Sequence, residues 1–128
     1  IWSNQVDPAN ANINIDKSEK TAPVIQNKSS IENIKFARFL NEQGIIMYSA
    51  YWCPHCHDQK ELFGKEAAAE LTIIECAKDG KNNQFETCQE KGIEGYPSWE
   101  INNQIYSGTR ELSEIAEITN YPFKSELK

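Results

Sequence analysis

The apolar residues of this chain recur at spacings that alternate between those of helices and those of strands. Behind the serine pair at 29–30, apolar positions three and four residues apart predict a helix that ends at Gly44, because serine is a good N-cap and glycine a good C-cap. Residues 45–49 and 71–76 are short, mostly apolar runs, which predicts two strands buried in a sheet.

Further elements continue the same alternation. Residues 54–70 are rich in good helix formers, with a break expected at Gly64, and a short helix is predicted to end at Gly92. The Asn pair at 102–103 suits a two-residue hairpin turn, and apolar positions over 111–119 form one stripe of a last helix. The order helix, strand, helix, strand, helix, strand, strand, helix predicts an α/β fold, a three-layer α/β/α sandwich with a central mixed sheet.

The beginning of the chain differs in composition from the rest. Residues 1–28 are rich in Asn, Asp, Ser, Lys and Pro and show no sustained helix or strand period, which predicts a flexible tail or linker. Residues 29–128 then form one domain, since a chain of 128 residues is too short for two cores. The chain opens with Ile1 rather than Met, so we expect a longer precursor, in which a preceding segment could tether the domain to a membrane.

Charge and cysteine content narrow the possible functions. The 13 basic and 19 acidic side chains give a formal net charge of −6, and no run of basic residues exceeds two. Nucleic acid is therefore not an expected partner, because binding it requires clustered Lys and Arg. Four cysteines could form two disulfides, which persist in oxidising compartments, so we expect an extracytoplasmic location.

The sequence Cys53-Pro54-His55-Cys56 lies directly behind the first predicted strand, at the expected start of a helix. Unpaired N–H groups and the helix dipole favour negative charge there, so we expect Cys53 to carry the nucleophilic thiolate. Pro54 suits the first turn of a helix, and a protonated His55 would stabilise the thiolate further. Cys56, one turn into the helix, would resolve the mixed disulfide. A stabilised thiolate favours the reduced form, so the Cys53–Cys56 disulfide, with no other bound cofactor, is expected to oxidise its substrates.

Two other interpretations of this motif are weaker. A zinc site could use the same pair, but Cys76 and Cys88 lie 12 positions apart and do not form a second zinc knuckle, so no metal is expected. A purely structural disulfide is also disfavoured, because such a short-range pair constrains little of the unfolded chain. The neighbouring His57 is expected to face solvent on the helix.

Two motifs together resemble a thioredoxin-fold domain over about residues 30–121. The first is Trp52-Cys53-Pro54-His55-Cys56, and the second, about 40 residues later, is Gly92-Ile93-Glu94-Gly95-Tyr96-Pro97-Ser98. The resemblance implies that Pro97, preceded by Tyr96, is a cis-proline packed beside the active disulfide.

The chain is more specifically similar to the thioredoxin-like domain associated with bacterial and plant vitamin K epoxide reductase homologues. The residues that carry this similarity are 52–56, 62–67, 75–76, 79–80, 88, 92–93, 96–97 and 107–108. Such domains pass oxidising equivalents from the membrane reductase, and ultimately a quinone, to secreted proteins. The resemblance implies protein thiol and disulfide substrates, a vitamin K epoxide reductase-like membrane partner, and a location in the bacterial periplasm or the thylakoid lumen.

One position departs from the thioredoxin pattern. Thioredoxins have a buried Asp, which relays protons, where this chain has Met47, and fast thioredoxin-style reduction is therefore not expected. Glu75, at the end of the neighbouring predicted strand, could replace that carboxylate, although a solvated or salt-bridged Glu75 is the favoured interpretation.

The remaining cysteines and the aromatic residues complete the expected site. Cys76 and Cys88 flank a polar loop, and a structural disulfide closing about 13 residues would stabilise the fold by roughly 3 kcal/mol. The alternative is that this pair relays electrons to the dithiol, which requires the two pairs to lie close together. Tyr51, Trp52 and Tyr96 are predicted to form an apolar surface where polypeptide substrates bind.

The sequence therefore predicts a thiol-disulfide oxidoreductase that transfers a disulfide to proteins outside the cytoplasm. Two alternatives stay open. The domain could instead be a reductant that delivers electrons to an apoprotein such as a cytochrome precursor, or it could be a non-catalytic thioredoxin-fold binding module.

Overall fold

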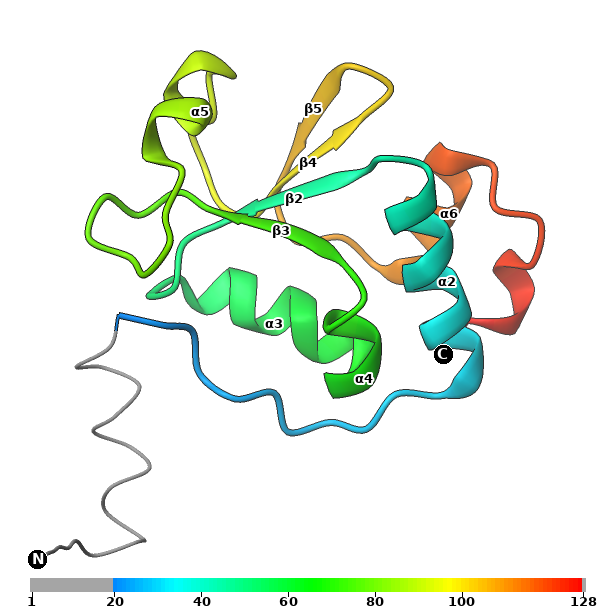
Figure 1. Cartoon of the computed structure of the whole chain (residues 1–128). Coiled ribbons are helices and arrows are strands. Elements are labelled where there is room, and N and C mark those ends of the chain that lie inside the picture. The colour runs from blue at the N-terminus through cyan, green and yellow to red at the C-terminus, as the bar shows by residue number, and fades with distance from the viewer. Residues whose placement is uncertain (1–19, 128) are drawn as a thin grey trace, which may run out of the picture.

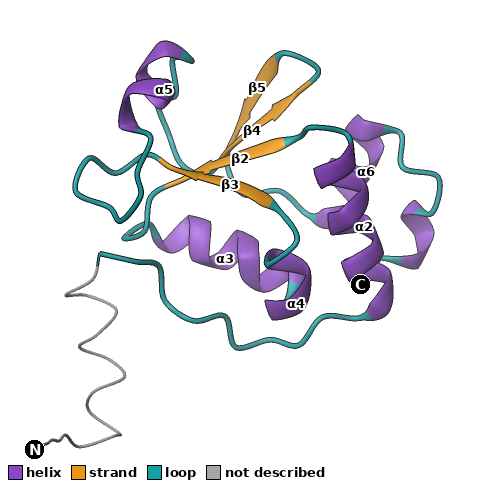
Figure 2. Ribbon diagram, viewed as in Figure 1, coloured by secondary structure: helices purple, strands orange, loops and turns teal. Residues whose placement is uncertain are grey.

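The computed structural model describes residues 20–127. Its elements are shown in Figure 1 and, by type, in Figure 2. In chain order they are α2 (Ile31–Glu42), β2 (Ile46–Ser49), α3 (Pro54–Phe63), α4 (Lys65–Ala68), β3 (Thr72–Glu75), α5 (Phe85–Glu90), β4 (Ser98–Ile101), β5 (Gln104–Ser107), α6 (Leu112–Thr119) and the 3-10 helix η1 (Lys124–Glu126). The predicted order of helices and strands is confirmed in this part of the chain.

Within residues 20–127, four short strands form one mixed sheet in the order β3-β2-β4-β5. Strand β2 pairs in parallel with β3 and antiparallel with β4, which in turn forms a hairpin with β5. Asn102 and Asn103 make the hairpin turn, with φ angles of 52° and 67° that asparagine tolerates well. The run 71–76 was predicted as a buried strand, and this is wrong: β3 ends the sheet formed by the described residues, so Thr72 is exposed and the rest of β3 is half-buried.

The main hydrophobic core lies on one face of the sheet. Helices α2, α3, α4 and α6 contribute to it, and Figure 1 shows α3 and α4 beneath the strands. Phe63 connects the layers, because its ring lies 6.0 Å from that of Phe36 in α2 and 6.0 Å from that of Trp99 in β4. Met47, opposite Trp99 in the register of the sheet, is fully buried in this core.

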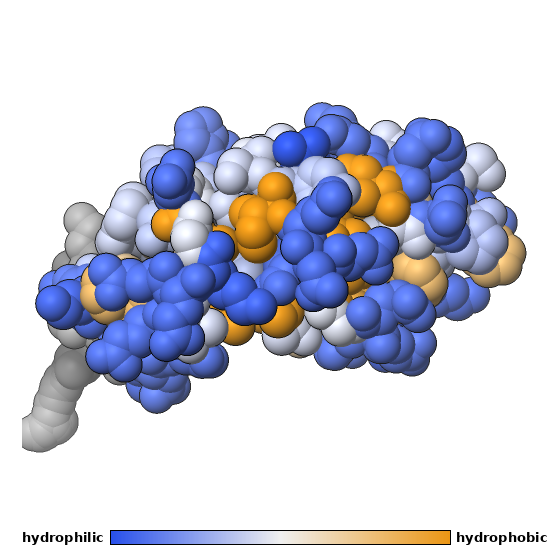
Figure 3. All heavy atoms as spheres, turned by 90° about the horizontal axis from the view of Figure 1, so that it is seen from above, coloured by the Kyte–Doolittle hydropathy of each residue, from blue (hydrophilic) through white to orange (hydrophobic). Residues whose placement is uncertain are grey.

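The other face of the sheet has a thinner cover. Tyr48 packs there with the Cys76–Cys88 disulfide, and α5 lies above the strands in Figure 1. Figure 3 views the molecule from this side and shows hydrophobic atoms between the hydrophilic ones. The α/β class and the thioredoxin-like sandwich are therefore confirmed, with one thick and one thin helical layer.

Local signals account for the helix boundaries. The Ser30 side chain accepts a hydrogen bond from the Asn33 backbone N–H at 3.1 Å and so caps α2. Gly64, at φ 94°, separates α3 from α4, and a Cβ there would lie 2.4 Å from the Ser29 hydroxyl. Only glycine fits this conformation and this close approach, which explains the predicted break.

The segment before α2 lies along α3. Glu61 in α3 accepts hydrogen bonds from the backbone N–H groups of Gln26 and Asn27, at 3.0 and 2.9 Å. The Asn27 carbonyl accepts one from the Lys65 backbone N–H at 2.7 Å. These contacts concern the last part of the predicted tail, residues 1–28. Residues 1–19 lie outside the described residues, and the boundary between 28 and 29 stays a prediction.

No helix within residues 20–127 is long and apolar enough to cross a membrane.

Candidate active site

The dithiol lies where β2 ends and α3 begins. Cys53 is the N-cap residue of α3 and Pro54 occupies its first turn, as the sequence indicated. The Cys53 backbone N–H donates to the Ala50 carbonyl at 3.0 Å, which closes a tight turn before the helix. Both thiols are free, with Cys53 7% and Cys56 1% exposed, so the nucleophile predicted at Cys53 is the more accessible of the two.

The second motif meets the dithiol at Tyr96. The Cys53 thiol donates a hydrogen bond to the Tyr96 carbonyl oxygen across 3.6 Å, although the two residues are 43 positions apart in sequence. The Tyr96–Pro97 peptide bond is cis, as the resemblance implied, and Pro97 is buried. The fold thus places the cis-proline segment directly against the attacking sulfur.

Cys56 is buried one turn behind Cys53. This burial raises the pKa of the Cys56 thiol to about 12, although hydrogen bonds from the Ser49 side chain and the Ala50 backbone favour its thiolate. Cys56 therefore holds its proton until another group accepts it, as expected for a resolving thiol that acts second.

Lys60 lies near the thiols and was not predicted as a site residue. Its side chain is only 9% exposed, and burial lowers its pKa, while negative charge at Cys56, Glu75 and Cys53 acts in the opposite direction. Lys60 follows Cys56 by one helical turn, and this spacing was a usable signal that the two share a face of α3.

Gln59, also not predicted, connects α3 to the segment before α6. It is fully buried, and its Oε1 atom accepts hydrogen bonds from Trp99 Nε1 at 3.1 Å and from the Arg110 backbone N–H at 2.9 Å. Its Nε2 atom donates to the Arg110 carbonyl at 2.9 Å. Nearby, Thr109 donates to the His55 carbonyl at 3.2 Å. These bonds hold the start of α3 in place.

The two histidines have different surroundings. His55 is exposed on the first turn of α3, next to Cys53. His57 was predicted to face solvent, and this is wrong: it is half-buried and its Nε2 atom lies 3.0 Å from the Glu61 carboxylate. The segment before α2 runs alongside α3 here, and its Gln26 and Asn27 bind the same Glu61 carboxylate that pairs with His57.

A cavity of about 590 Å³ opens beside Cys53. Its lining residues are Lys20, Thr21, Pro23, Tyr51, Trp52, Cys53, Pro54, His57 and Asp58. Trp52 is 59% exposed and packs edge-on against Tyr96, with ring centroids 6.0 Å apart. The Tyr51 hydroxyl donates to Asp79 at 3.0 Å. The three predicted substrate-binding aromatics therefore surround the dithiol, and Pro23 in the segment before α2 adds a wall that the sequence did not indicate.

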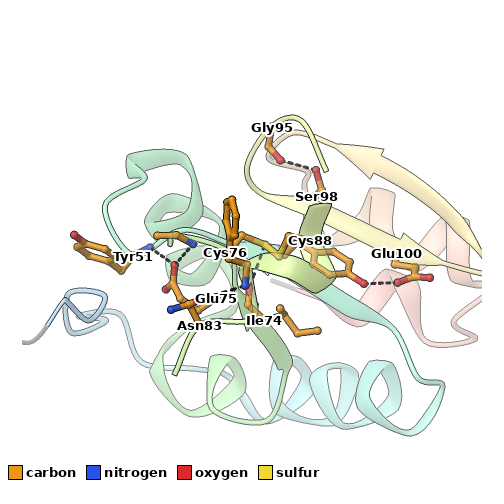
Figure 4. The surroundings of a disulfide bond; sticks show 12 residues. Tyr51, Ile74, Glu75, Cys76, Asn83, Cys88, Gly95, Ser98 and Glu100 are labelled. Atoms are coloured by element: carbon orange, nitrogen blue, oxygen red, sulfur yellow. Dashed lines mark hydrogen bonds between the residues drawn. A yellow bond between two sulfur atoms is a disulfide. The ribbon is translucent and has the colours of Figure 1, made fainter. Parts of the chain in front are cut away.

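The second cysteine pair lies apart from the first. Cys76, just after β3, and Cys88, in α5, form a disulfide with their Cα atoms 5.8 Å apart (Figure 4). Both are buried beside Tyr48 on the thinly covered face, whereas Cys53 and Cys56 belong to the main core. This packing gives no support to an electron relay between the two pairs.

Within residues 20–127, no three His, Cys, Asp or Glu side chains lie together in a way that could hold a metal ion.

Comparison with known proteins agrees with this geometry. No protein-family model matches the chain. The chain is 45% identical over 100 residues to the thiol-disulfide oxidoreductase LTO1 of Arabidopsis thaliana, an overlap that covers 76% of this chain. The chain belongs to the thioredoxin-fold oxidoreductases. Protein disulfide-isomerases of Aspergillus niger and Arthroderma benhamiae are 30% and 32% identical to it, over 77% and 72% of its length.

This thioredoxin-fold domain is much shorter than its relatives. The aligned part spans 27% of the Arabidopsis protein and 20% and 18% of the two isomerases. The similarity therefore concerns only a part of each relative.

Proposed function

We propose that this domain is a thiol-disulfide oxidoreductase that transfers the Cys53–Cys56 disulfide to polypeptide substrates. The observation that carries the proposal is the position of the Cys53 sulfur. It lies at the start of α3, 3.6 Å from the Tyr96 carbonyl beside the cis-proline, with Cys56 buried one turn behind it. An incoming thiolate can then reach Cys53 more readily than Cys56.

The reaction proceeds by two thiol-disulfide exchanges. A substrate thiolate attacks the Cys53 sulfur, which forms a mixed disulfide, breaks the Cys53–Cys56 bond and leaves Cys56 to take up a proton. A second substrate thiolate then attacks the substrate sulfur of the mixed disulfide and releases Cys53 as a thiolate. The substrate dithiol loses two electrons and two protons in total, and the domain gains the two electrons as its own dithiol.

Two features favour the oxidising direction. Cys53 is the N-cap residue of α3, and any group that stabilises negative charge on a dithiol favours its reduced form and makes its disulfide a better oxidant. Met47 fills the position of the thioredoxin carboxylate and is fully buried, so no acidic group there assists reduction of a substrate.

The surroundings of Cys53 suit a polypeptide substrate. The cavity beside Cys53 has mainly apolar walls, and it is large enough for a side chain that neighbours the substrate cysteine. Tyr51 and Trp52 line it, and Tyr96 packs against Trp52. An extended substrate segment could also pair with the backbone beside Pro97, which would make recognition largely independent of side chains.

We further propose that a vitamin K epoxide reductase-like membrane protein reoxidises the domain, in the bacterial periplasm or the thylakoid lumen. The support is the sequence similarity around residues 52–56, 75–76 and 96–97, together with a disulfide that suits an oxidising compartment. The reduced domain should be reoxidised in detergent by a reductase of this class together with a quinone, and a Cys53→Ser variant should not be. A wild-type domain that such a reductase leaves reduced would exclude this partner.

Equilibration with glutathione tests the activity itself. Mass spectrometry should show exchange at Cys53–Cys56 and an unchanged Cys76–Cys88 disulfide, and the opposite result would reverse the two roles. Cys56→Ser should accumulate a mixed disulfide on Cys53 because nothing resolves it, whereas Cys53→Ser should accumulate little.

The same equilibrium measures the direction of electron flow. A reduction potential near −120 mV would support oxidation of substrates, and one near −270 mV would support the reductant alternative. Undiminished activity of Cys53→Ser in the cell would support the non-catalytic binding module instead.

A further inference from the structure

The turn over residues 49–51 contacts both cysteines of the dithiol, Cys53 through its backbone and Cys56 through its sulfur. The Ala50 carbonyl accepts the Cys53 backbone N–H, and the Ser49 side chain and Ala50 backbone hydrogen-bond to the Cys56 sulfur. A shift of this turn would therefore displace the Cys53 backbone and change the hydrogen bonding of the Cys56 sulfur.

This turn is fastened to the end of β3 by two hydrogen bonds. The Ser49 carbonyl accepts the Cys76 backbone N–H at 2.7 Å. The Glu75 Oε2 atom accepts the Tyr51 backbone N–H at 3.1 Å and also the Ala77 backbone N–H at 2.9 Å. Figure 4 shows the Glu75 carboxylate between these partners, next to the Cys76–Cys88 disulfide.

The loop that follows β3 fixes the position of Glu75. The Glu75 carbonyl accepts the Gln84 backbone N–H at 2.7 Å, within the loop that the disulfide closes. Gly80 in the same loop packs against the Glu75 side chain so closely that a Cβ at residue 80 would lie 2.7 Å from Glu75 Cγ. The loop thus leaves one narrow space for this side chain.

We propose that Glu75 is a positioning residue for the dithiol, which joins the disulfide-closed loop to the turn at 49–51 through its two backbone hydrogen bonds. The inference rests on the proposed redox function, since its consequence is a change in the Cys53–Cys56 equilibrium. Glu75 does not touch the sulfurs; it fixes the backbone that does.

Charge offers a competing route by which Glu75 could act on the dithiol. Lys60 and Tyr96 each interact electrostatically with Glu75 and with both thiols, and Tyr51 interacts with Glu75 and donates to Asp79. Removing a carboxylate charge near the thiols would favour the thiolates and hence the reduced form, whereas loosening the turn would remove hydrogen bonds from the reduced form and favour the disulfide. The two routes shift the equilibrium in opposite directions.

The experiment measures the equilibrium constant of Cys53–Cys56 with glutathione in three variants. Glu75→Ala removes both hydrogen bonds and should shift the equilibrium towards the protein disulfide. The expected shift is about fivefold, which corresponds to the net free energy of about one hydrogen bond. Glu75→Gln retains an acceptor oxygen but no charge, and should stay within about twofold of the wild type because a neutral acceptor keeps the turn in place. Glu66→Ala is the matched control: Glu66 also accepts a backbone N–H, from Ser29 at 2.9 Å, and its loss should lower stability without moving the equilibrium.

A fourth variant displaces the Glu75 side chain without replacing it. Gly80→Ala puts a methyl group against the Glu75 side chain and should shift the equilibrium in the same direction as Glu75→Ala. Because both changes act through one side chain, Gly80→Ala should add nothing in the Glu75→Ala background. If Glu75→Ala is poorly stable, Gly80→Ala alone still tests whether the position of the Glu75 side chain sets the equilibrium.

Three results would overturn the inference: a Glu75→Ala equilibrium equal to the wild type, equal shifts in Glu75→Ala and Glu75→Gln, or a Gly80→Ala effect that persists without Glu75. Failure of the proposed function looks different, because the wild-type Cys53–Cys56 pair would then not exchange with glutathione at all.

Discussion

Reducing the Cys76–Cys88 disulfide should lower the free energy of unfolding by roughly 3 kcal/mol. The two cysteines are separated by 12 positions, and the entropy lost by an unfolded chain with a loop of that length sets the value in the chain-entropy model. With a urea dependence of about 1–3 kcal/mol per M for small proteins, the unfolding midpoint should fall by about 1–3 M.

The measurement is cleanest in a Cys53→Ala/Cys56→Ala background. Only one disulfide can then form within the chain, so dithiothreitol changes a single bond, and the same protein serves as its own control. Urea unfolding followed by tryptophan fluorescence, with and without reductant, gives the difference, and mass spectrometry counts the free thiols.

A fully reduced protein with an unchanged midpoint would refute the reasoning from loop closure. Cys76→Ala/Cys88→Ala in the same background should be less stable than the reduced protein, because both sulfurs are buried against Tyr48 and their removal leaves a void. A variant as stable as the oxidised protein would show that neither the crosslink nor this packing contributes.

Two further predictions concern α3. Burial raises the pKa of the Cys56 thiol to about 12, above the value of about 8.5 expected in the unfolded chain. Between these two pH values the native state keeps a proton that the unfolded state loses. The contribution of Cys56 to the free energy of unfolding is therefore complete below about pH 8.5 and declines as the pH rises towards 12. In a Cys53→Ala background, the stability difference between proteins with Cys56 and with Cys56→Ala should thus decline between pH 8.5 and 10, and a constant difference would contradict the burial of this thiol. Gln59→Ala should cost about 2–4 kcal/mol, because it leaves Trp99 Nε1 and the Arg110 backbone without partners. Gln59→Met restores most of the side-chain volume but provides no acceptor for Trp99. If thermal unfolding showed full stability in this variant, the contribution of Gln59 to stability would come from packing rather than from hydrogen bonding.

Local signals predicted the elements well because each boundary depends on a few neighbouring residues. Ser30 caps α2, Gly64 separates α3 from α4 by its φ of 94°, and the Asn pair at 102–103 makes the hairpin turn, each through a local hydrogen bond or φ angle. The burial of β3 was predicted wrongly because it depends on the pairing of distant strands rather than on neighbouring residues. An apolar run looks the same in a central and an edge strand, and only the pairing of the sheet decides which it is.

The candidate site likewise has a part that the sequence predicts and a part that it does not. The spacing of Cys53 and Cys56 and the Tyr96–Pro97 motif are readable along the chain. The partners of Gln59, 51 positions away at Arg110, are not, because nothing local marks a glutamine as a buried junction between two segments.

The sequence by itself determined the order of elements, the position of the dithiol at a helix N-terminus and the cysteine spacing, since these follow from propensities and periodicity over short stretches. Only the tertiary structure decided how deeply Cys56 is buried, where Glu75 and Lys60 lie relative to the dithiol, and which residues line the cavity beside Cys53. Those properties depend on burial and on hydrogen bonds between segments distant in sequence, and such contacts exist only once the helices have packed against the sheet.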